Sequence, residues 1–247
     1  MPRIDFLNTK IDNVSMEEAV DSIASLIQEN NSAYVVTPNL DHIVILEKDD
    51  EFAKVYKNAD LILADGKPLI WISKLLGTSI KEKVSGSDIF PEICQMAAMK
   101  GYSIYILGAA NGVAAKAAAN LKEQYMGLNI VGTYSPPFGF EKNTNELEKI
   151  RKLITEANPD ILAVSLGSPK GEKFIYHHLH EYSVPLSISI GATIDFEAGN
   201  VKRAPKWMSK VGLEWLYRTI KEPKRLAKRY WNDAVSIVPI IIKCRNK

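Results

Sequence analysis

YSIYILGAANGVAAKAAANLKEQYMGLNIVGT, residues 102–133, carries the strongest signal for a fold in this chain. It begins with a short apolar run at 102–107, continues with a helical pattern at 112–125 and ends with a second apolar run at 129–133. Short apolar runs bounded by turn residues are typical of buried strands, and a helix is the usual connection between two parallel strands. This order predicts a parallel sheet covered by helices on both faces.

The same alternation recurs along most of the chain. Further buried strands are expected at 33–37, 61–64, 161–166 and 186–190, and further helices at 15–30, 145–157 and 170–182. Ser15 and Glu18 form a capping-box pattern at the start of the first helix. We therefore predict an α/β fold with a Rossmann-like parallel sheet, in which the Pro- and Gly-rich residues 134–140 form a loop over the sheet.

Positive charge is concentrated in the carboxyl-terminal segment. Residues 196–247 contain 13 Lys or Arg and 4 Asp or Glu, a net charge of +9, so residues 1–195 carry −7 of the overall +2. The sign changes near residues 198–205, which contain Gly and Pro. These features predict a Rossmann-like domain at 1–197 and a helical appendage at 198–247 that binds an anionic partner, either a membrane surface or a polyphosphate.

The appendage combines basic and aromatic residues. The basic side chains recur every three or four residues, at Arg218, Lys221, Arg225 and Lys228. Pro223 is the expected interruption of this stripe. Tryptophan and tyrosine interleave with it, as in helices that lie at a membrane interface. The most apolar run, 235–242, is shorter than the roughly 18–20 residues that cross a bilayer. We expect membrane association without crossing, although the same charges would also suit nucleic acid.

The rest of the sequence favours an intracellular setting. Charged Arg3 and Asp5 near the amino terminus, with no apolar run behind them, do not form the pattern of a signal peptide. Cys94 and Cys244 are isolated and match no metal-site spacing, which favours a reducing compartment without disulfides. We expect a cytoplasmic protein that lies peripherally on the inner face of the cell membrane.

Polar residues follow several predicted strands, at the edge where open parallel sheets bind ligands. Asp65 follows the strand at 61–64, and a carboxylate beside apolar neighbours is the best candidate for a general base, although Asp-Gly is also an ordinary turn. Thr37 and Asn39 could orient a sugar hydroxyl, or could simply lead from a strand into a helix. Asp195 follows the last strand at the same edge.

Phosphate and metal sites are the other chemistry considered. Gly108 and Gly112 lie between a strand and a helix, so the amides there could hold a phosphate or could form only a tight turn. Residues 167–170 leave the same two alternatives. The histidines within residues 177–181 match no metal-site spacing and indicate a solvated helix face. The chain has no DxD motif, so we expect no metal ion to hold a nucleotide diphosphate.

Six segments together resemble one known family: VVTPNLDHIV (35–44), LADGKPLIW (63–71), VSGSDIFP (84–91), VGTYSPPFGF (131–140), LGSPKGEKF (166–174) and the long segment at 194–230. They are similar to the WecG/TagA/CpsF family of bacterial glycosyltransferases. The resemblance implies an inverting transferase that moves N-acetylmannosamine from UDP-ManNAc to polyprenyl-diphosphate-linked N-acetylglucosamine, a step that builds the linkage unit of teichoic acid. Because relatives often self-associate, homo-oligomer formation is a further expectation, with no contact surface identified.

The resemblance also implies roles for individual residues. Asp65 would deprotonate the acceptor hydroxyl, with Thr37 and Asn39 beside it. The residues expected around the donor are Asp195, Arg218, Arg225 and Lys228. Without a metal ion, preorganised cations of this kind can stabilise the charge that develops on the leaving diphosphate.

Lys83 and Gly171 depart from the family pattern. Relatives commonly carry Arg where this chain has the substrate-binding candidate Lys83, and Lys keeps the charge but loses the bidentate fork. Relatives usually carry Gln at the position of Gly171. A transferase of a different UDP-hexose, as in capsule synthesis, is therefore the principal alternative. From another class, a nucleotide- or nucleic-acid-binding module with a basic arm also fits the charge distribution, although we expect no nucleic-acid partner.

Overall fold

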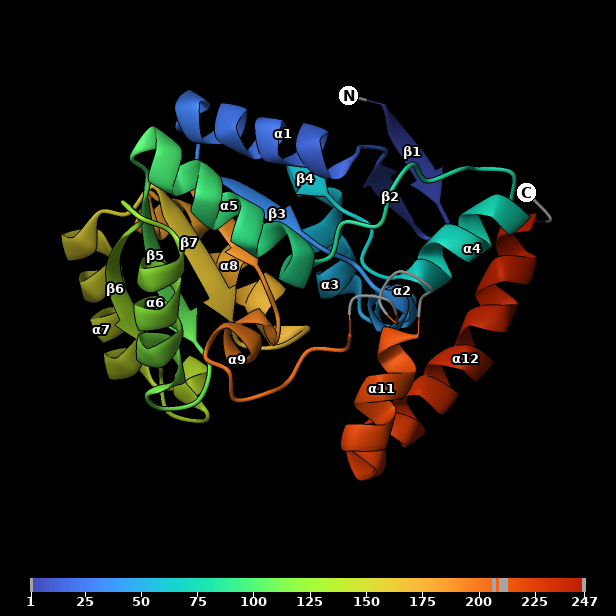
Figure 1. Ribbon diagram of the computed structural model, residues 1–247. Coiled ribbons are helices and arrows are strands. Elements are labelled where there is room, and N and C mark those ends of the chain that lie inside the picture. Colours follow the sequence, from blue (N-terminus) through green and yellow to red (C-terminus); the bar gives the residue numbers. More distant parts are fainter. Residues whose placement is uncertain (1, 206–207, 209–212, 246–247) are drawn as a thin grey trace.

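The computed structural model describes residues 2–205, 208 and 213–245, without the side chain of Arg225. Its centre is a six-stranded parallel sheet in the order β4-β3-β8-β7-β5-β6 (Figure 1). The strands are β3 (Ala33–Val36), β4 (Leu61–Ile62), β5 (Ser103–Gly108), β6 (Asn129–Tyr134), β7 (Ile161–Ser165) and β8 (Leu186–Ser189). Each strand expected from an apolar run is present, which confirms the predicted α/β fold class.

Helices cover both faces of this sheet. One layer contains α1 (Met16–Glu29), α5 (Gly86–Lys100), α6 (Val113–Gln124) and α9 (Thr193–Glu197). The other contains α2 (Leu40–Leu46), α3 (Asp50–Lys57), α4 (Lys67–Leu75), α7 (Thr144–Ala157) and α8 (Lys170–Tyr182), with the short 3-10 helix η1 (Phe140–Lys142). Side chains of a strand alternate between the faces, so Val35 packs in the first layer whereas Tyr34 and Val36 pack in the second.

Local capping signals account for where several helices begin. The capping box of Ser15 and Glu18 is present at α1, as predicted. The sequence analysis did not identify α2, α3, α4 and α5, although a side chain caps three of them. Asn39 caps α2, Asp49 caps α3 and Ser85 caps α5 by accepting a hydrogen bond from a backbone amide of the first turn.

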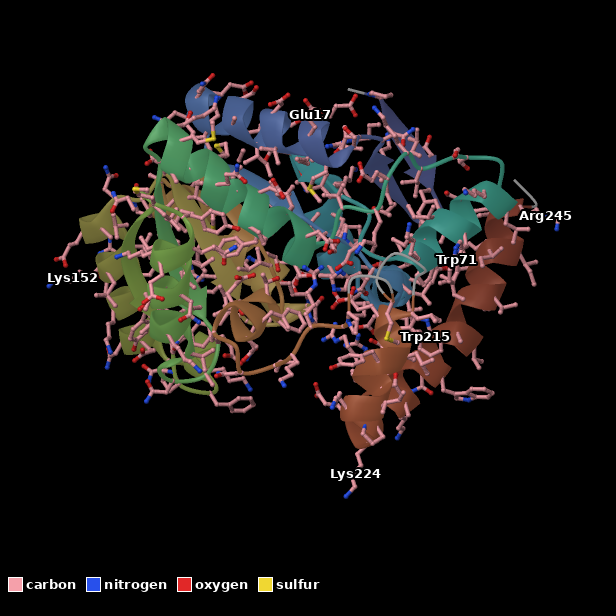
Figure 2. The ribbon with its side chains drawn as sticks, viewed as in Figure 1. Glu17, Trp71, Lys152, Trp215, Lys224 and Arg245 are labelled. Atoms are coloured by element: carbon pink, nitrogen blue, oxygen red, sulfur yellow. The ribbon has the colours of Figure 1, made fainter. Side chains whose placement is uncertain are left out.

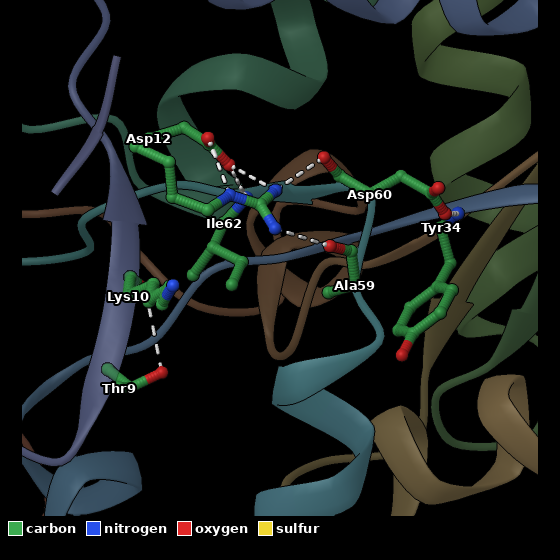
Figure 3. Close-up of polar contacts among 8 residues, drawn as sticks. Thr9, Lys10, Asp12, Tyr34, Ala59, Asp60 and Ile62 are labelled. Atoms are coloured by element: carbon green, nitrogen blue, oxygen red, sulfur yellow. Dashed lines mark hydrogen bonds and ion pairs between the residues drawn. The ribbon is translucent and has the colours of Figure 1, made fainter. Parts of the chain in front are cut away.

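A two-stranded hairpin that the sequence analysis also missed covers the edge of β4. Its antiparallel strands are β1 (Arg3–Phe6) and β2 (Thr9–Asp12). The carboxylate of Asp12 accepts a hydrogen bond of 2.8 Å from the Ile62 amide and is held by the Arg3 guanidinium, which also donates to the Asp60 carbonyl (Figure 3). Asp12 thus satisfies an amide of the edge strand that no neighbouring strand pairs, and fixes the strand that leads to Asp65.

The carboxyl-terminal segment forms α11 (Glu214–Lys221) and α12 (Pro223–Arg245), which pack against each other. Pro223 begins α12, so the basic stripe is divided where the sequence analysis expected an interruption. Both helices lie at the α2 end of the molecule, far from α7 (Figure 1). Ile237 and Ile240 of α12 are buried in the same core cluster as Ile43 of α2. The terminal helices are therefore docked on the body, and the domain boundary at residues 198–205 stays a prediction.

None of the helices in the described part of the chain combines the length and apolarity that crossing a bilayer requires.

Candidate active site

A cavity of about 350 Å³ lies where the carboxyl ends of β3 and β4 face the terminal helices. Its lining comes from the loops after these two strands, the start of α4, the segment that leads into α5, and α11 and α12. Trp71 of α4 and Trp215 of α11 both line it, and Figure 2 shows them in the region where α4 approaches the terminal helices. The predicted body and appendage therefore form this cavity together.

Asp65 is the carboxylate at the centre of this arrangement. It follows β4, lines the cavity and keeps a partly accessible side chain. Dense protein surroundings nevertheless raise the pKa of Asp65 from 3.8 to about 7, because burial disfavours the charged form. Lys83 and Arg218 oppose this rise in pKa, whereas Asp88 and Glu214 add to it. A carboxyl group of near-neutral pKa can take up a proton at physiological pH, as a general base must.

Lys83 brings a positive charge to the cavity wall from the loop before α5. Its side chain is only 15% exposed, and its ammonium lies 2.5 Å from a carboxylate oxygen of Asp88. Ser85, the capping residue of α5, donates a hydrogen bond of 2.6 Å to the same oxygen of Asp88. Lys83 therefore reaches the cavity already paired, in a fixed position.

The terminal helices add two guanidinium groups to the cavity lining. Arg218 of α11 lies over the ring of Phe196, 5.9 Å from its centroid. Arg229 of α12 has a terminal nitrogen 3.9 Å from Asp41, and its buried Nε atom has no hydrogen-bond partner among the described residues. A buried donor without a partner costs free energy, so Arg229 is suited to bind an anionic ligand here.

Two further acidic residues share the wall with Arg229. Asp41 of α2 and Asp233 of α12 both line the cavity, and their carboxyl groups form a hydrogen bond. Burial and, to a lesser extent, the neighbouring Asp41 raise the pKa of Asp233 to about 7, although Arg229 opposes the rise. Protonation of Asp233 near neutral pH limits the negative charge beside Arg229. Because carboxylates accept hydrogen bonds from hydroxyl groups, this wall is also suited to a sugar.

Four of the site residues that the sequence analysis predicted lie at this cavity. Asp65, Asn39, Lys83 and Arg218 all line it. Asn39 also caps α2, with its side-chain oxygen 3.3 Å from the His42 amide. Asn39 therefore leads from a strand into a helix and also lines the cavity, so the two alternatives predicted for it are compatible.

Thr37, Gly108 and Gly112 lie outside the cavity lining. Thr37 is buried against Gly86, where an added Cβ atom would lie 3.4 Å from the threonine hydroxyl. A Cβ atom at Gly108 would lie 2.2 Å from the Ser165 carbonyl oxygen, so close packing of β5 on β7 accounts for this glycine. Gly112 caps α6 with a φ of 78°, in the left-handed region that favours glycine. The alternative of a tight turn suffices for both glycines.

The remaining donor candidates are dispersed. Asp195 lies on α9, where burial and the nearby Glu222 raise its pKa, and it is not part of the cavity lining. Lys228 points to solvent from α12. The side chain of Arg225 lies outside the described residues. The structure thus gathers only part of the predicted donor-binding set around one cavity.

Sequence reasoning assigned no role to Arg229, Asp41 and Asp233, although Asp41 follows the strand at 33–37 at the expected edge of the sheet. Arg229 directly follows Lys228, so the sequence indicated positive charge at this point of the chain. It did not indicate which of the two side chains faces the body. Pro223 at the start of α12 and the docking of this helix on α2 determine this orientation. The cavity-lining residues of α12, at 229, 230, 233 and 234, then share one helical face.

The histidines at 177–181 have no role in the cavity. His177 lies 2.7 Å from Glu51, and His178 lies 2.5 Å from Glu181. Within residues 2–205, 208 and 213–245, no group of three or more His, Cys, Asp or Glu side chains could hold a metal ion.

The fold and the cavity define an α/β enzyme in which a carboxylate of near-neutral pKa faces a cluster of cations, an arrangement suited to group transfer from an anionic leaving group. The sequence profile of the family described as "Glycosyl transferase WecG/TagA/CpsF family" matches residues 4–247. The chain belongs to this family and is a glycosyltransferase, as the sequence resemblance indicated.

Two curated relatives are similar in sequence to this chain over most of its length. The chain is 32% identical over 211 residues to a protein of Bacillus subtilis (strain 168), covering 85% of this chain and 78% of the relative. It is 25% identical over 228 residues to a protein of Staphylococcus aureus (strain MW2), covering 92% of this chain and 87% of the relative. Both relatives are named N-acetylglucosaminyldiphosphoundecaprenol N-acetyl-beta-D-mannosaminyltransferase.

Proposed function

We propose that this protein transfers N-acetylmannosamine from UDP-ManNAc to polyprenyl-diphosphate-linked N-acetylglucosamine, with inversion at the transferred carbon and with Asp65 as the general base. The observation that carries the proposal is the position of Asp65, a carboxylate with a pKa of about 7, in a cavity that is also lined by Lys83, Arg218 and Arg229. The names of the two relatives support the choice of both sugars and of the lipid diphosphate.

The reaction requires one base and neutralisation of one leaving group. Asp65 removes the proton from the acceptor hydroxyl as its oxygen attacks the anomeric carbon, and the bond from that carbon to the diphosphate of UDP breaks on the opposite side. The electron pair of this bond leaves with UDP, so negative charge grows on the diphosphate. Lys83, Arg218 and Arg229 line the same cavity as Asp65, and we propose that they stabilise that charge without a metal ion.

Because the proposed acceptor is a lipid, we propose peripheral attachment to the inner face of the cell membrane through α11 and α12. Large apolar side chains of these helices are exposed, among them Ile220, Trp231, Val235, Val238 and Ile242. Lys224 projects from the tip of the helix pair (Figure 2). Exposed apolar and basic side chains on one helix pair are typical of interfacial helices that bind anionic lipids.

The first experiment is a panel of UDP-sugars tested with a polyprenyl-diphosphate-linked N-acetylglucosamine acceptor. We expect transfer from UDP-ManNAc with the highest kcat/KM, and a product of inverted anomeric configuration. Efficient transfer from a UDP-glucose or UDP-galactose donor, with none from UDP-ManNAc, would instead favour a transferase of capsule synthesis. The product of the expected reaction would serve a surface polymer such as teichoic acid.

A further inference from the structure

Asp88, in the first turn of α5, connects the cavity wall with the segment that leads to the terminal helices. One carboxylate oxygen of Asp88 lies 2.5 Å from the Lys83 ammonium and accepts the 2.6 Å hydrogen bond from Ser85. Its other oxygen is paired with the guanidinium of Arg203, on the segment that leads from α9 to the terminal helices. Arg203 also donates a hydrogen bond of 3.1 Å to the Ser87 carbonyl. Asp88 is therefore held between two cations, one in the cavity wall and one on the connecting segment.

The ion pairs of Asp88 with Lys83 and Arg203 are partly shielded from water. The side chains of Asp88 and Lys83 are 22% and 15% exposed, and that of Arg203 is 34% exposed. Ion pairs at such sites are fixed more firmly than pairs on the open surface, because solvent screens them less. Despite its burial, the pKa of Asp88 is lowered, since Lys83, Ser85 and Arg203 all favour its charged form.

We propose that Asp88 is a positioning residue for the proposed reaction: it holds Lys83 at the cavity wall beside Asp65, and through Arg203 it couples that position to the segment that carries the terminal helices. The proposal rests on the function proposed above. Asp88 does not line the cavity. Its effect on the reaction passes through Lys83, whose charge would otherwise be free to move toward Asp65.

The charges around Asp65 give the direction of the effect. The charged groups that act on Asp65 are Lys83, Asp88, Glu214 and Arg218, from the loop before α5, from α5 and from α11. The substitution Asp88→Asn removes one negative charge from this set and releases Lys83 from its partner. Both changes lower the pKa of Asp65, because both favour its carboxylate form. Asp65 then becomes a weaker base.

The test is the pH dependence of kcat/KM for the full chain. With Asp88→Asn we expect the acid limb to move to lower pH by about one unit and the plateau to fall about 10-fold. Asp88→Glu, which keeps the charge, should retain an acid limb near that of the unchanged protein. As a matched control, Glu148→Gln breaks the exposed pair with Arg151 on α7 and should leave the limb in place.

Arg203 is tested by a double-mutant cycle. If Arg203 acts through Asp88, then Arg203→Gln should add little to the loss that Asp88→Asn already causes. Losses that multiply in the double variant, or an acid limb that Asp88→Asn leaves unmoved, would overturn the proposal. An NMR titration of the Asp65 carboxyl carbon, in the unchanged protein and in the Asp88→Asn variant, measures the shift in the pKa of Asp65 without any turnover. Failure of the glycosyl-transfer assay would therefore refute the proposed function separately from the positioning role of Asp88.

Discussion

The body of the molecule and its terminal helices differ in how completely they bury their apolar side chains. The strands β3, β5, β7 and β8 are buried along their whole length, whereas α11 contains no buried residue. In α12, Trp231 is 72% exposed although Leu226 and Ile240 are buried. The central strands of the body thus bury their apolar side chains, although helix and loop residues of the body such as Leu75, Met126 and Phe138 are exposed. The terminal helices expose several large apolar side chains, as the proposed membrane attachment requires.

The two regions also differ in what they contribute to the cavity. The body provides Asp65 and Lys83, and the terminal helices provide Arg218 and Arg229. The helices of the basic segment therefore supply two of these three cations, while the acidic body supplies Asp65, the proposed base. If the proposed mechanism is correct, neither region can catalyse transfer without the other.

The largest expected effect comes from the base in the body. Asp65→Asn should lower kcat by about 100- to 10,000-fold, because Asn cannot accept the proton of the acceptor hydroxyl. Initial rates of sugar transfer measure this loss, and a thermal melt shows whether the fold is kept. Asp5→Asn, at a surface position of the hairpin, is the matched control and should retain full activity. Activity within a few-fold of the unchanged protein would remove Asp65 from its role.

The next effect comes from the cations of the terminal helices. Arg218→Gln and Arg229→Gln should each lower kcat/KM by about 10- to 100-fold, since a charge-assisted hydrogen bond contributes about 1.5–3 kcal/mol. Lys221→Gln removes the same charge from an exposed position on α11 and serves as control. Equal losses in all three variants would mean that overall charge, and not position in the cavity, is what matters.

A smaller effect is expected at the membrane. Trp231→Ala combined with Ile242→Ala should weaken binding to anionic vesicles by about 10-fold or more, because each side chain would bury apolar area in the lipid interface. Sedimentation with vesicles measures the binding. Phe138→Ala removes a fully exposed aromatic side chain from a loop of the body and should not change sedimentation. Unchanged binding of the double variant would separate these helices from the membrane.

Much of the fold could be predicted from the sequence because buried parallel strands are short, continuous apolar runs. The hairpin of β1 and β2 escaped notice because its strands are only four residues long and partly exposed. Its importance depends on Asp12 reaching the edge of β4, a contact between residues 50 positions apart. No local pattern in the sequence reports such a contact.

The candidate site was predictable only to the level of a sheet edge. That edge extends from β4 to β6, so Asp65 and Gly108 satisfied the same rule although only Asp65 lines the cavity. The docking of α12 on α2 determines which half of the edge becomes the cavity. The same docking decides that Arg229, and not the exposed Lys228, faces it.

The smallest expected effect concerns the pH dependence of stability, and it lies in the core of the body. Burial raises the pKa of Glu172 from 4.5 to about 7, and one of its carboxylate oxygens is buried with no hydrogen-bond partner in the part of the chain that the structure describes. The folded state therefore holds this proton to higher pH than the unfolded chain does. As a result, the contribution of this group to the free energy of unfolding falls as the pH rises from about 4.5 to about 7, and is constant at higher pH.

Glu172→Gln should reduce this slope and stabilise the protein by about 1 kcal/mol at pH 8, since the relief of the buried charge outweighs the cost of an unpaired amide. Urea unfolding at pH 5 and pH 8 measures the change. Binding to vesicles should not change, because Glu172 lies on α8 in the body. An unaltered slope would show that Glu172 holds no extra proton in the folded state.

The most direct test of the joint site is sugar transfer by the full chain in the presence of EDTA, with and without the double substitution Arg218→Gln and Arg229→Gln. We expect the unchanged protein to keep its turnover in EDTA and the double variant to lose at least about 100-fold in kcat/KM. A strict requirement for magnesium or manganese, or a double variant of undiminished activity, would contradict the role of the terminal helices in neutralising the leaving diphosphate.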